Sequence, residues 1–193
     1  MNNRGLSFFK RKSKKVFGVP LEEAIDKSSI NNGLPIVLTR CVDYLERTAI
    51  KHEGIYRRSG NQKTVEDLIK IYDMGKDPDL EEYDPFVISG LLKRYFTLLP
   101  DPITSFDLYD KFLAAQMLPN KAMRPRQMKA LLDQLPKANQ YVLYFIIQHL
   151  VNVAKHDEEN KMGINNLAIV FGPTLFRSKD ESPVRLLSDV AFL

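Results

Sequence analysis

The chain has 193 residues, enough for one domain with a full core, and its 44% hydrophobic and 27% charged content is ordinary for a globular protein. One cysteine, Cys41, excludes an intramolecular disulfide, and no apolar run reaches the length of a membrane span. A cytoplasmic protein is expected, with Cys41 as a packed thiol on a helical apolar stripe.

The net charge of +4 is concentrated at the N-terminus. Residues 1–20 contain no acidic residue and six basic ones: Arg4, Lys10, Arg11, Lys12, Lys14 and Lys15. The remainder has 22 basic and 24 acidic residues and a net charge of −2. This nearly neutral body argues against a nucleic-acid-binding domain.

Residues 1–15 are predicted to form a flexible basic tail. Three interpretations stay open: a solvated arm, a patch attracted to anionic lipid, and a nuclear import signal. Phe8 and Phe9 beside the lysines favour lipid over import, because aromatic rings can enter the headgroup region while the cations meet phosphates.

Residues 16–193 are predicted to form a single all-α domain, a helical bundle, because alternating period-two segments are scarce. Apolar residues recur at helical spacing after Pro35 and again from Val65 to Tyr72, before Gly75. Segment 139–156 is apolar almost all round and is expected to be a central helix buried by its neighbours. Four more helices are predicted over residues 85–98, 106–118, 126–135 and from Asn160 towards Pro173.

The stretch HEGIYRRSGN, residues 52–61, places two arginines after an apolar pair and between two glycines. The glycines permit sharp turns, and Ile55 and Tyr56 can fix the turn to a core. Arg57 and Arg58 are then either cations mounted for insertion into another molecule or ordinary solvated charges.

Two later helices carry polar residues away from their predicted core stripes. Lys93 and Thr97 lie one turn apart on such a flank. On the helix after Asn160, the predicted core face contains Ile164, Leu167, Val170 and Phe171. The opposite face gathers Met162, Asn166 and Ile169, which form either a small docking patch or a surface covered by another helix.

The sequence contains no set of residues with the spacing typical of an enzyme active site. The three histidines have no zinc-ligand spacing with the cysteine, and neither a GxSxG elbow nor a phosphate-binding glycine loop occurs. His149 is predicted to be a hydrogen-bonded core histidine. A protein with no active site of its own can still supply one group to a partner's site.

Four segments together resemble the Rho GTPase-activating protein (RhoGAP) domain: FGVPLEEAI, GIYRRSGN, LLKRYFTLLPDPI and NKMGINNLAIVFGPTL. They follow the family's order and spacing from about Val16 to the C-terminus. RLLSDVAFL resembles the beginning of the family's final helix, which the end of the chain at Leu193 would cut short.

The resemblance implies an all-α domain that binds a Rho- or Rac-type small GTPase in its GTP-bound state and inserts an arginine finger in trans. Arg57, directly after the aromatic residue of the motif, is the implied finger. GTP and magnesium would belong to the partner, so no cofactor of its own is expected, nor nucleic acid, and a monomer is expected. Recruitment to the inner face of the plasma membrane through residues 1–15 is a further expectation.

The motif positions imply roles for the other candidates. Lys93 matches the lysine that supports the finger loop and faces the GTPase, and Arg58 falls at a variable position as a helping cation. Thr97 departs from the family, which usually has an arginine there to brace the loop. The remaining interface residues implied are Asn166, flanked by Met162 and Ile169.

Two other functions stay open beside GTPase activation. Thr97 supports the alternative that the chain is a catalytically weak module that binds and sequesters a Rho GTPase without activating it. The basic tail supports the alternative of a membrane-associated scaffold. No position in the sequence indicates which Rho-family GTPase is preferred.

Overall fold

The structure is a computed structural model that describes residues 15–26, 33–180 and 182. These residues form helices and no strands, which confirms the all-α prediction. The basic tail, apart from Lys15, and the RLLSDVAFL segment lie outside the described residues. Among the described helices, none combines the length and the apolar character needed to cross a lipid bilayer.

Nine α-helices are described, with three short 3₁₀ turns between them. Their bounds are α1 Leu21–Asp26, α2 Ile36–Thr48, α3 Gln62–Asp73, α4 Pro85–Thr97, α5 Tyr109–Gln116, α6 Arg124–Leu132, α7 Lys137–Ala154, α8 Asp157–Asn160 and α9 Ile164–Leu175. Each long helix predicted from periodicity is present, within a few residues of its predicted ends.

Helix ends follow local chemistry. The Asn61 side chain caps α3 by accepting a hydrogen bond from the Thr64 backbone, and Asp84 caps α4 by accepting one from Phe86. Pro85 occupies the first turn of α4, where no backbone donor is required. Gly75, with φ of 74°, follows the end of α3. These signals fix where α3 and α4 begin and where α3 ends.

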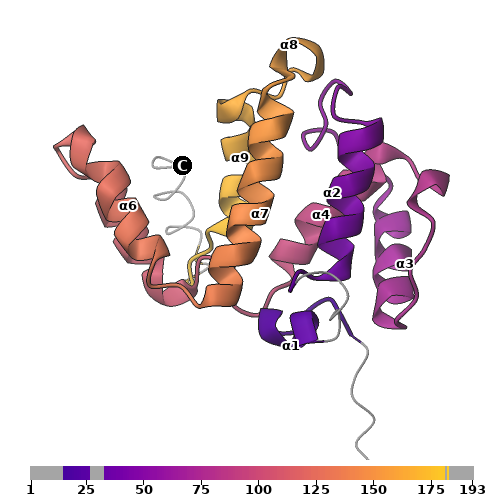
Figure 1. Ribbon diagram of the computed structural model, residues 1–193, viewed down its shortest axis with the longest axis horizontal. Coiled ribbons are helices and arrows are strands. Elements are labelled where there is room, and N and C mark those ends of the chain that lie inside the picture. The colour runs from indigo at the N-terminus through magenta and orange to yellow at the C-terminus, as the bar shows by residue number, and fades with distance from the viewer. Residues whose placement is uncertain (1–14, 27–32, 181, 183–193) are drawn as a thin grey trace, which may run out of the picture.

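Helix α4 is the centre of the bundle, because it packs against α2, α3 and α9. Seven of its residues are buried, Ile88, Leu91 and Leu92 among them. In Figure 1, α2, α3 and α4 form one side, α7 and α9 lie side by side next to them, and α6 stands apart on the other side. The fold therefore has a compact centre and a projecting α5–α6 arm.

Helix α7 is less enclosed than its apolar sequence predicts. Its inner face, with Val142 and Ile146, is buried against neighbouring helices, but Tyr144 is 64% exposed and Val151 is 48% exposed. The prediction of a central helix covered on all sides is therefore wrong. One face of α7 is core, and the other presents apolar side chains at the surface.

Candidate functional site

The 52–61 turn connects α2 to α3 and contains two residues in left-handed backbone conformations. Gly54 has φ of 75°, which glycine adopts readily. Tyr56 has φ of 69°, a conformation that costs a non-glycine residue about 1–2 kcal/mol. A tyrosine stays in this conformation only when its surroundings hold it there.

Tyr56 is held through both its side chain and its backbone. The ring is fully buried and lies edge-on against Phe171, with centroids 4.8 Å apart. Its hydroxyl is 2.5 Å from Nε2 of His149, and its carbonyl accepts a hydrogen bond from Nζ of Lys93 at 2.5 Å. The residue before Arg57 is thus fixed by contacts from α4, α7 and α9.

The buried Asn160 joins three segments beneath the turn. Its backbone carbonyl accepts a 2.8 Å hydrogen bond from Gly54, and its side-chain amide donates to the carbonyls of Ile50 and Val153 at 2.8 and 2.9 Å. Its side-chain oxygen accepts a hydrogen bond from the Met162 backbone at 2.8 Å. Asn160 therefore ties together the turn, the end of α7 and the connection that precedes α9.

The other side of the turn packs on the start of α4. The guanidinium carbon of Arg58 lies 4.3 Å from the centre of the Phe86 ring, which is cation–π geometry. Gly60 approaches the backbone so closely that a Cβ atom there would lie 2.4 Å from the nitrogen of Val87. Only glycine fits this contact, and it locks the end of the turn against α4.

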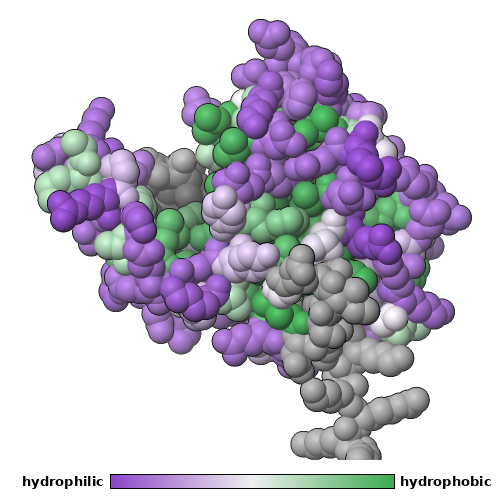
Figure 2. All heavy atoms as spheres, viewed as in Figure 1, coloured by the Kyte–Doolittle hydropathy of each residue, from purple (hydrophilic) through white to green (hydrophobic). Residues whose placement is uncertain are grey.

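Arg57 itself is exposed, and its side chain makes no hydrogen bond or ion pair with any residue of the described ranges. It lies at the rim of a groove of about 1360 Å³ between the α5–α6 arm and the α7–α9 pair. Apolar side chains line most of this groove: Tyr109, Phe112, Met128, Ile147, Leu150, Ile164, Phe171 and Leu175. Figure 2 shows apolar side chains in green where the α6 arm meets the rest of the molecule.

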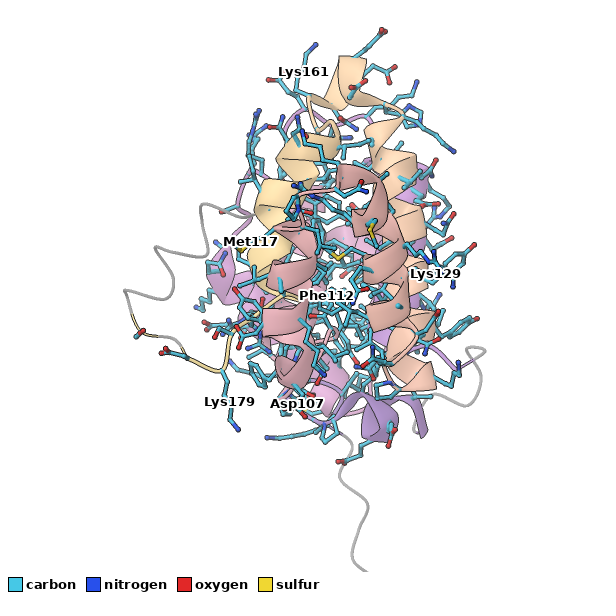
Figure 3. All side chains as sticks on the ribbon, turned by 90° about the vertical axis from the view of Figure 1, so that its left-hand side faces the viewer. Asp107, Phe112, Met117, Lys129, Lys161 and Lys179 are labelled. Carbon is cyan, nitrogen blue, oxygen red and sulfur yellow. The ribbon has the colours of Figure 1, made fainter. Side chains whose placement is uncertain are left out.

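Figure 3 views the molecule from the side of the α5–α6 arm. Phe112 of α5 lies midway along the molecule, and Lys161 lies at the end formed by α8. Asp107 and Lys179 lie at the opposite end. Because Lys161 and Arg57 both line the groove, its cationic part is at the α8 end, and its middle is apolar.

The structure brings three of the six other predicted site residues to the turn or to the groove beside Arg57. Lys93 is half-buried and reaches the turn through the Tyr56 carbonyl. Asn166 is half-buried, lines the same groove and donates to the Lys161 carbonyl at 2.9 Å. Arg58 is exposed but stacked on Phe86, which is a bracing contact within the protein.

Thr97 and Ile169 lie outside this group. The Thr97 hydroxyl donates to the carbonyl of Lys93 in its own helix at 3.0 Å, and no hydrogen bond from its side chain to the described turn is present. Ile169 is 66% exposed on α9 and does not line the groove. Its exposure agrees with the predicted surface position.

Two predictions about the α9 region are wrong. Met162 is fully buried, so it is a core residue and not part of an exposed docking patch. Ile164, predicted to lie in the core, is 74% exposed. The helix begins only at Ile164, and Met162 belongs to the preceding connection, which does not follow the helical 100° spacing.

Three pKa values around the turn depart from their usual range. Burial lowers the pKa of the Lys93 ammonium group. The hydrogen bond from His149 lowers the pKa of the Glu46 carboxyl group. Burial raises the pKa of the Tyr56 hydroxyl group well above its usual value. Lys93 is therefore a cation held in partly apolar surroundings beside the turn.

Sequence reasoning missed Glu46, Asn160 and Phe86, which all support the turn. His149 was predicted to be a hydrogen-bonded core residue, and this is confirmed, since its side chain is 1% exposed and bonds to Tyr56 and Glu46. Its partners come from positions 93 and 103 residues away in the chain, so no local pattern could identify them. A tyrosine beside the arginines was the only available signal.

Comparison with known proteins identifies the family. The model of the RhoGAP domain matches residues 35–180. "Rho GTPase-activating protein gacJJ" of Dictyostelium discoideum is 41% identical over 170 residues, which cover 88% of this chain and 19% of that protein. Human "Rho GTPase-activating protein 1" is 36% identical over 165 residues, covering 85% of this chain and 37% of that protein.

Solved structures agree with these matches. The crystal structure of human Rho GTPase activating protein 15 superposes with a TM-score of 0.82 at 26% identity, covering 96% of this chain and 90% of that one. The BH domain from GRAF gives a TM-score of 0.73 at 29% identity, covering 81% and 84%. The chain spans well under half the length of the two curated relatives above. By the extent of these matches and by its helical architecture, the chain belongs to the RhoGAP domain family.

Proposed function

We propose that this protein is a GTPase-activating module that stimulates GTP hydrolysis by a Rho-family small GTPase, and that Arg57 is the group it supplies. The observation that carries the proposal is the contrast between Arg57 and its base. The turn is held by a hydrogen bond that Lys93 donates to the Tyr56 carbonyl and by one that the Gly54 backbone donates to Asn160, while the Arg57 side chain is exposed and pairs with no described residue.

The chemistry follows from where charge develops during hydrolysis. As the bond to the γ-phosphoryl group breaks, negative charge spreads over phosphate oxygens, and a guanidinium group placed there stabilises it. Such an arginine accelerates hydrolysis roughly 10³- to 10⁵-fold, which lowers the barrier by about 4–7 kcal/mol. The nucleotide and its magnesium ion belong to the partner, so this chain contributes the cation and its orientation.

The groove beside Arg57 supports a role in binding. Ile164 is 74% exposed at its rim, and Lys161 and Asn166 lie close to it along the chain. An apolar wall with a few polar groups at one end is suited to a protein surface. We place the GTP-bound GTPase over this end of the groove, with Arg57 directed at its nucleotide.

A second candidate function rests on Thr97. The family's usual arginine would brace the finger loop from this position, but the Thr97 hydroxyl bonds only within α4. A module with this weaker bracing would bind and sequester a Rho GTPase with little activation. Tight binding without acceleration across a panel of Rho-family GTPases would favour it.

The experiment that tests the proposal measures GTP turnover by a panel of Rho-family GTPases with this protein and with Arg57→Ala and Arg57→Lys. The alanine variant should lose most of the stimulation while its affinity for the GTPase stays similar. Lysine should restore little, because a point charge cannot reproduce the planar donor fork of arginine. Full stimulation by Arg57→Ala would refute the role of Arg57.

A further inference from the structure

A buried chain of hydrogen bonds runs from the surface of α2 to the base of Arg57. Oε1 of Glu46 is 2.8 Å from Nδ1 of His149, and Nε2 of the same ring is 2.5 Å from the Tyr56 hydroxyl. The His149 side chain is 1% exposed and that of Glu46 is 36% exposed. The three side chains come from α2, α7 and the 52–61 turn.

The direction of donation in this series of hydrogen bonds is set by the Glu46 carboxylate at its outer end. An ionised Glu46 can only accept, so Nδ1 of His149 carries the hydrogen, and in the neutral imidazole ring Nε2 is left as an acceptor. The Tyr56 hydroxyl then donates to Nε2. Glu46 thereby selects the His149 tautomer that can hold Tyr56, as carboxylates do for histidines at metal and catalytic sites. The lowered pKa of the Glu46 carboxyl group agrees with its being ionised.

Packing alone does not account for these three side chains. A phenylalanine at position 56 would fill the same space and need no partner, whereas a buried hydroxyl and a buried imidazole are costly unless both are bonded. The same core contains Tyr72 and Tyr95, whose buried hydroxyls find no hydrogen-bond partner within the described ranges. Tyr56 differs from them in its partner, in its left-handed backbone and in its place directly before Arg57.

We propose that Glu46 and His149 are positioning residues for Arg57, acting through the Tyr56 ring to set the direction in which the arginine leaves the turn. This inference rests on the proposed function. If the Tyr56 ring is released, its strained backbone can relax, and the Cα–Cβ direction of Arg57 turns with it. The GTPase would still bind, but the guanidinium group would reach the nucleotide less often.

The experiment uses Tyr56→Phe, Glu46→Ala and Glu46→Gln, with Tyr95→Phe as the matched control that removes a buried but unpartnered hydroxyl. Tyr56→Phe and Glu46→Ala should lower the stimulated kcat roughly three- to tenfold, the scale of one buried hydrogen bond. The Kd for the GTPase should change less than twofold. Glu46→Gln should keep most of the rate, because its amide oxygen still accepts from Nδ1 of His149.

The decisive measurement places Tyr56→Phe in the Arg57→Ala background. There it should cause no further loss of rate, because a positioning residue acts only through the group that it positions. An equal loss in both backgrounds, a rise in Kd matching the loss in kcat, or the same loss in Tyr95→Phe would overturn the inference. Melting temperatures of all variants identify any loss caused by unfolding. If Tyr56→Phe folds poorly, the comparison of Glu46→Ala with Glu46→Gln still tests the inference, and equal rates for these two variants would overturn it.

The two proposals fail in different ways. Arg57→Ala without effect would refute the proposed function and this inference with it. Arg57→Ala inactive, with Tyr56→Phe and Glu46→Ala both fully active, would refute only the positioning role.

Discussion

The Lys93 side chain carries its charge into a half-buried position where no carboxylate of the described residues pairs with it. Its ammonium group donates one hydrogen bond within the described part of the chain, to the Tyr56 carbonyl, and burial lowers the pKa of this group. An unpaired cation in partly apolar surroundings costs stability. We propose that Lys93 is retained beside Arg57 for its function at the turn, since the core gains little from it.

Replacing Lys93 with methionine should separate stability from activity. The loss of one hydrogen bond and the relief of burying a charge oppose each other, so the free energy of unfolding should change by less than about 1 kcal/mol. The stimulated kcat should fall roughly tenfold or more, because a charge-assisted hydrogen bond to the turn is lost. Chemical denaturation and GTP turnover measure the two effects.

The pH dependence of this stability difference has a defined sign. Because the Lys93 pKa is lowered in the folded state, the unfolded chain binds more protons between the folded pKa and the usual value of 10.5. The stability of the unsubstituted protein relative to Lys93→Met should therefore rise as the pH rises towards 10.5. A difference that falls with rising pH would contradict the burial of a charged Lys93.

At the scale of elements, α9 contributes both buried and exposed apolar side chains to the groove. Leu167 and Phe171 are buried, whereas Ile164 in the first turn is 74% exposed. Exposed apolar side chains beside a candidate cation are typical of the centre of a protein interface. The first turn of α9 is therefore the best place to separate binding from turnover.

Ile164→Ser should weaken binding of the GTPase and leave the bundle intact. Loss of one well-buried aliphatic contact in the complex should raise KM about tenfold with little change in kcat. The matched control is Met74→Ser, since Met74 is 52% exposed at the far end of α3, roughly 18 Å along that helix from the turn. Equal effects of the two substitutions on KM would rule out this face of α9 as the binding surface.

Helix identity could be predicted from the sequence, but the environment of several helix faces could not. The stripe of Val37, Leu38 and Cys41 on α2 is fully buried as predicted, because periodicity alone decides which side faces a core. Met162 was assigned to the surface because the connection before α9 departs from helical geometry, and Ile164 was assigned to the core although it is the exposed first residue of α9. The exposed face of α7 was missed because an apolar sequence does not tell which neighbours are present.

At the scale of the whole molecule, the sequence separates a basic tail from a nearly neutral body. Residues 1–15 carry all six of the early basic residues, together with Phe8 and Phe9. Each basic residue near an anionic membrane surface contributes about 1 kcal/mol of attraction. We propose that this tail, rather than the helical body, determines any association with anionic lipid.

Vesicle sedimentation tests the tail directly. The full chain should pellet with vesicles containing phosphatidylserine at low salt, and a chain lacking residues 1–15 should not. Neutral phosphatidylcholine vesicles are the control, and about 1 M salt should release the protein because it shortens the screening length to about 3 Å. Equal pelleting of the two chains would assign the association to the helical body. It would then support a membrane-associated scaffold function for that body instead of for the tail.

The contacts of Gly60 with α4 and of Gly54 with Asn160 have a consequence for how quickly a complex forms. These contacts hold the loop in one shape, so we expect association with a GTPase to cost little backbone entropy and to order mainly the Arg57 side-chain torsions, at about 2 kcal/mol. We therefore expect rigid-body docking, with an on-rate set by diffusion and orientation rather than by rearrangement of the loop.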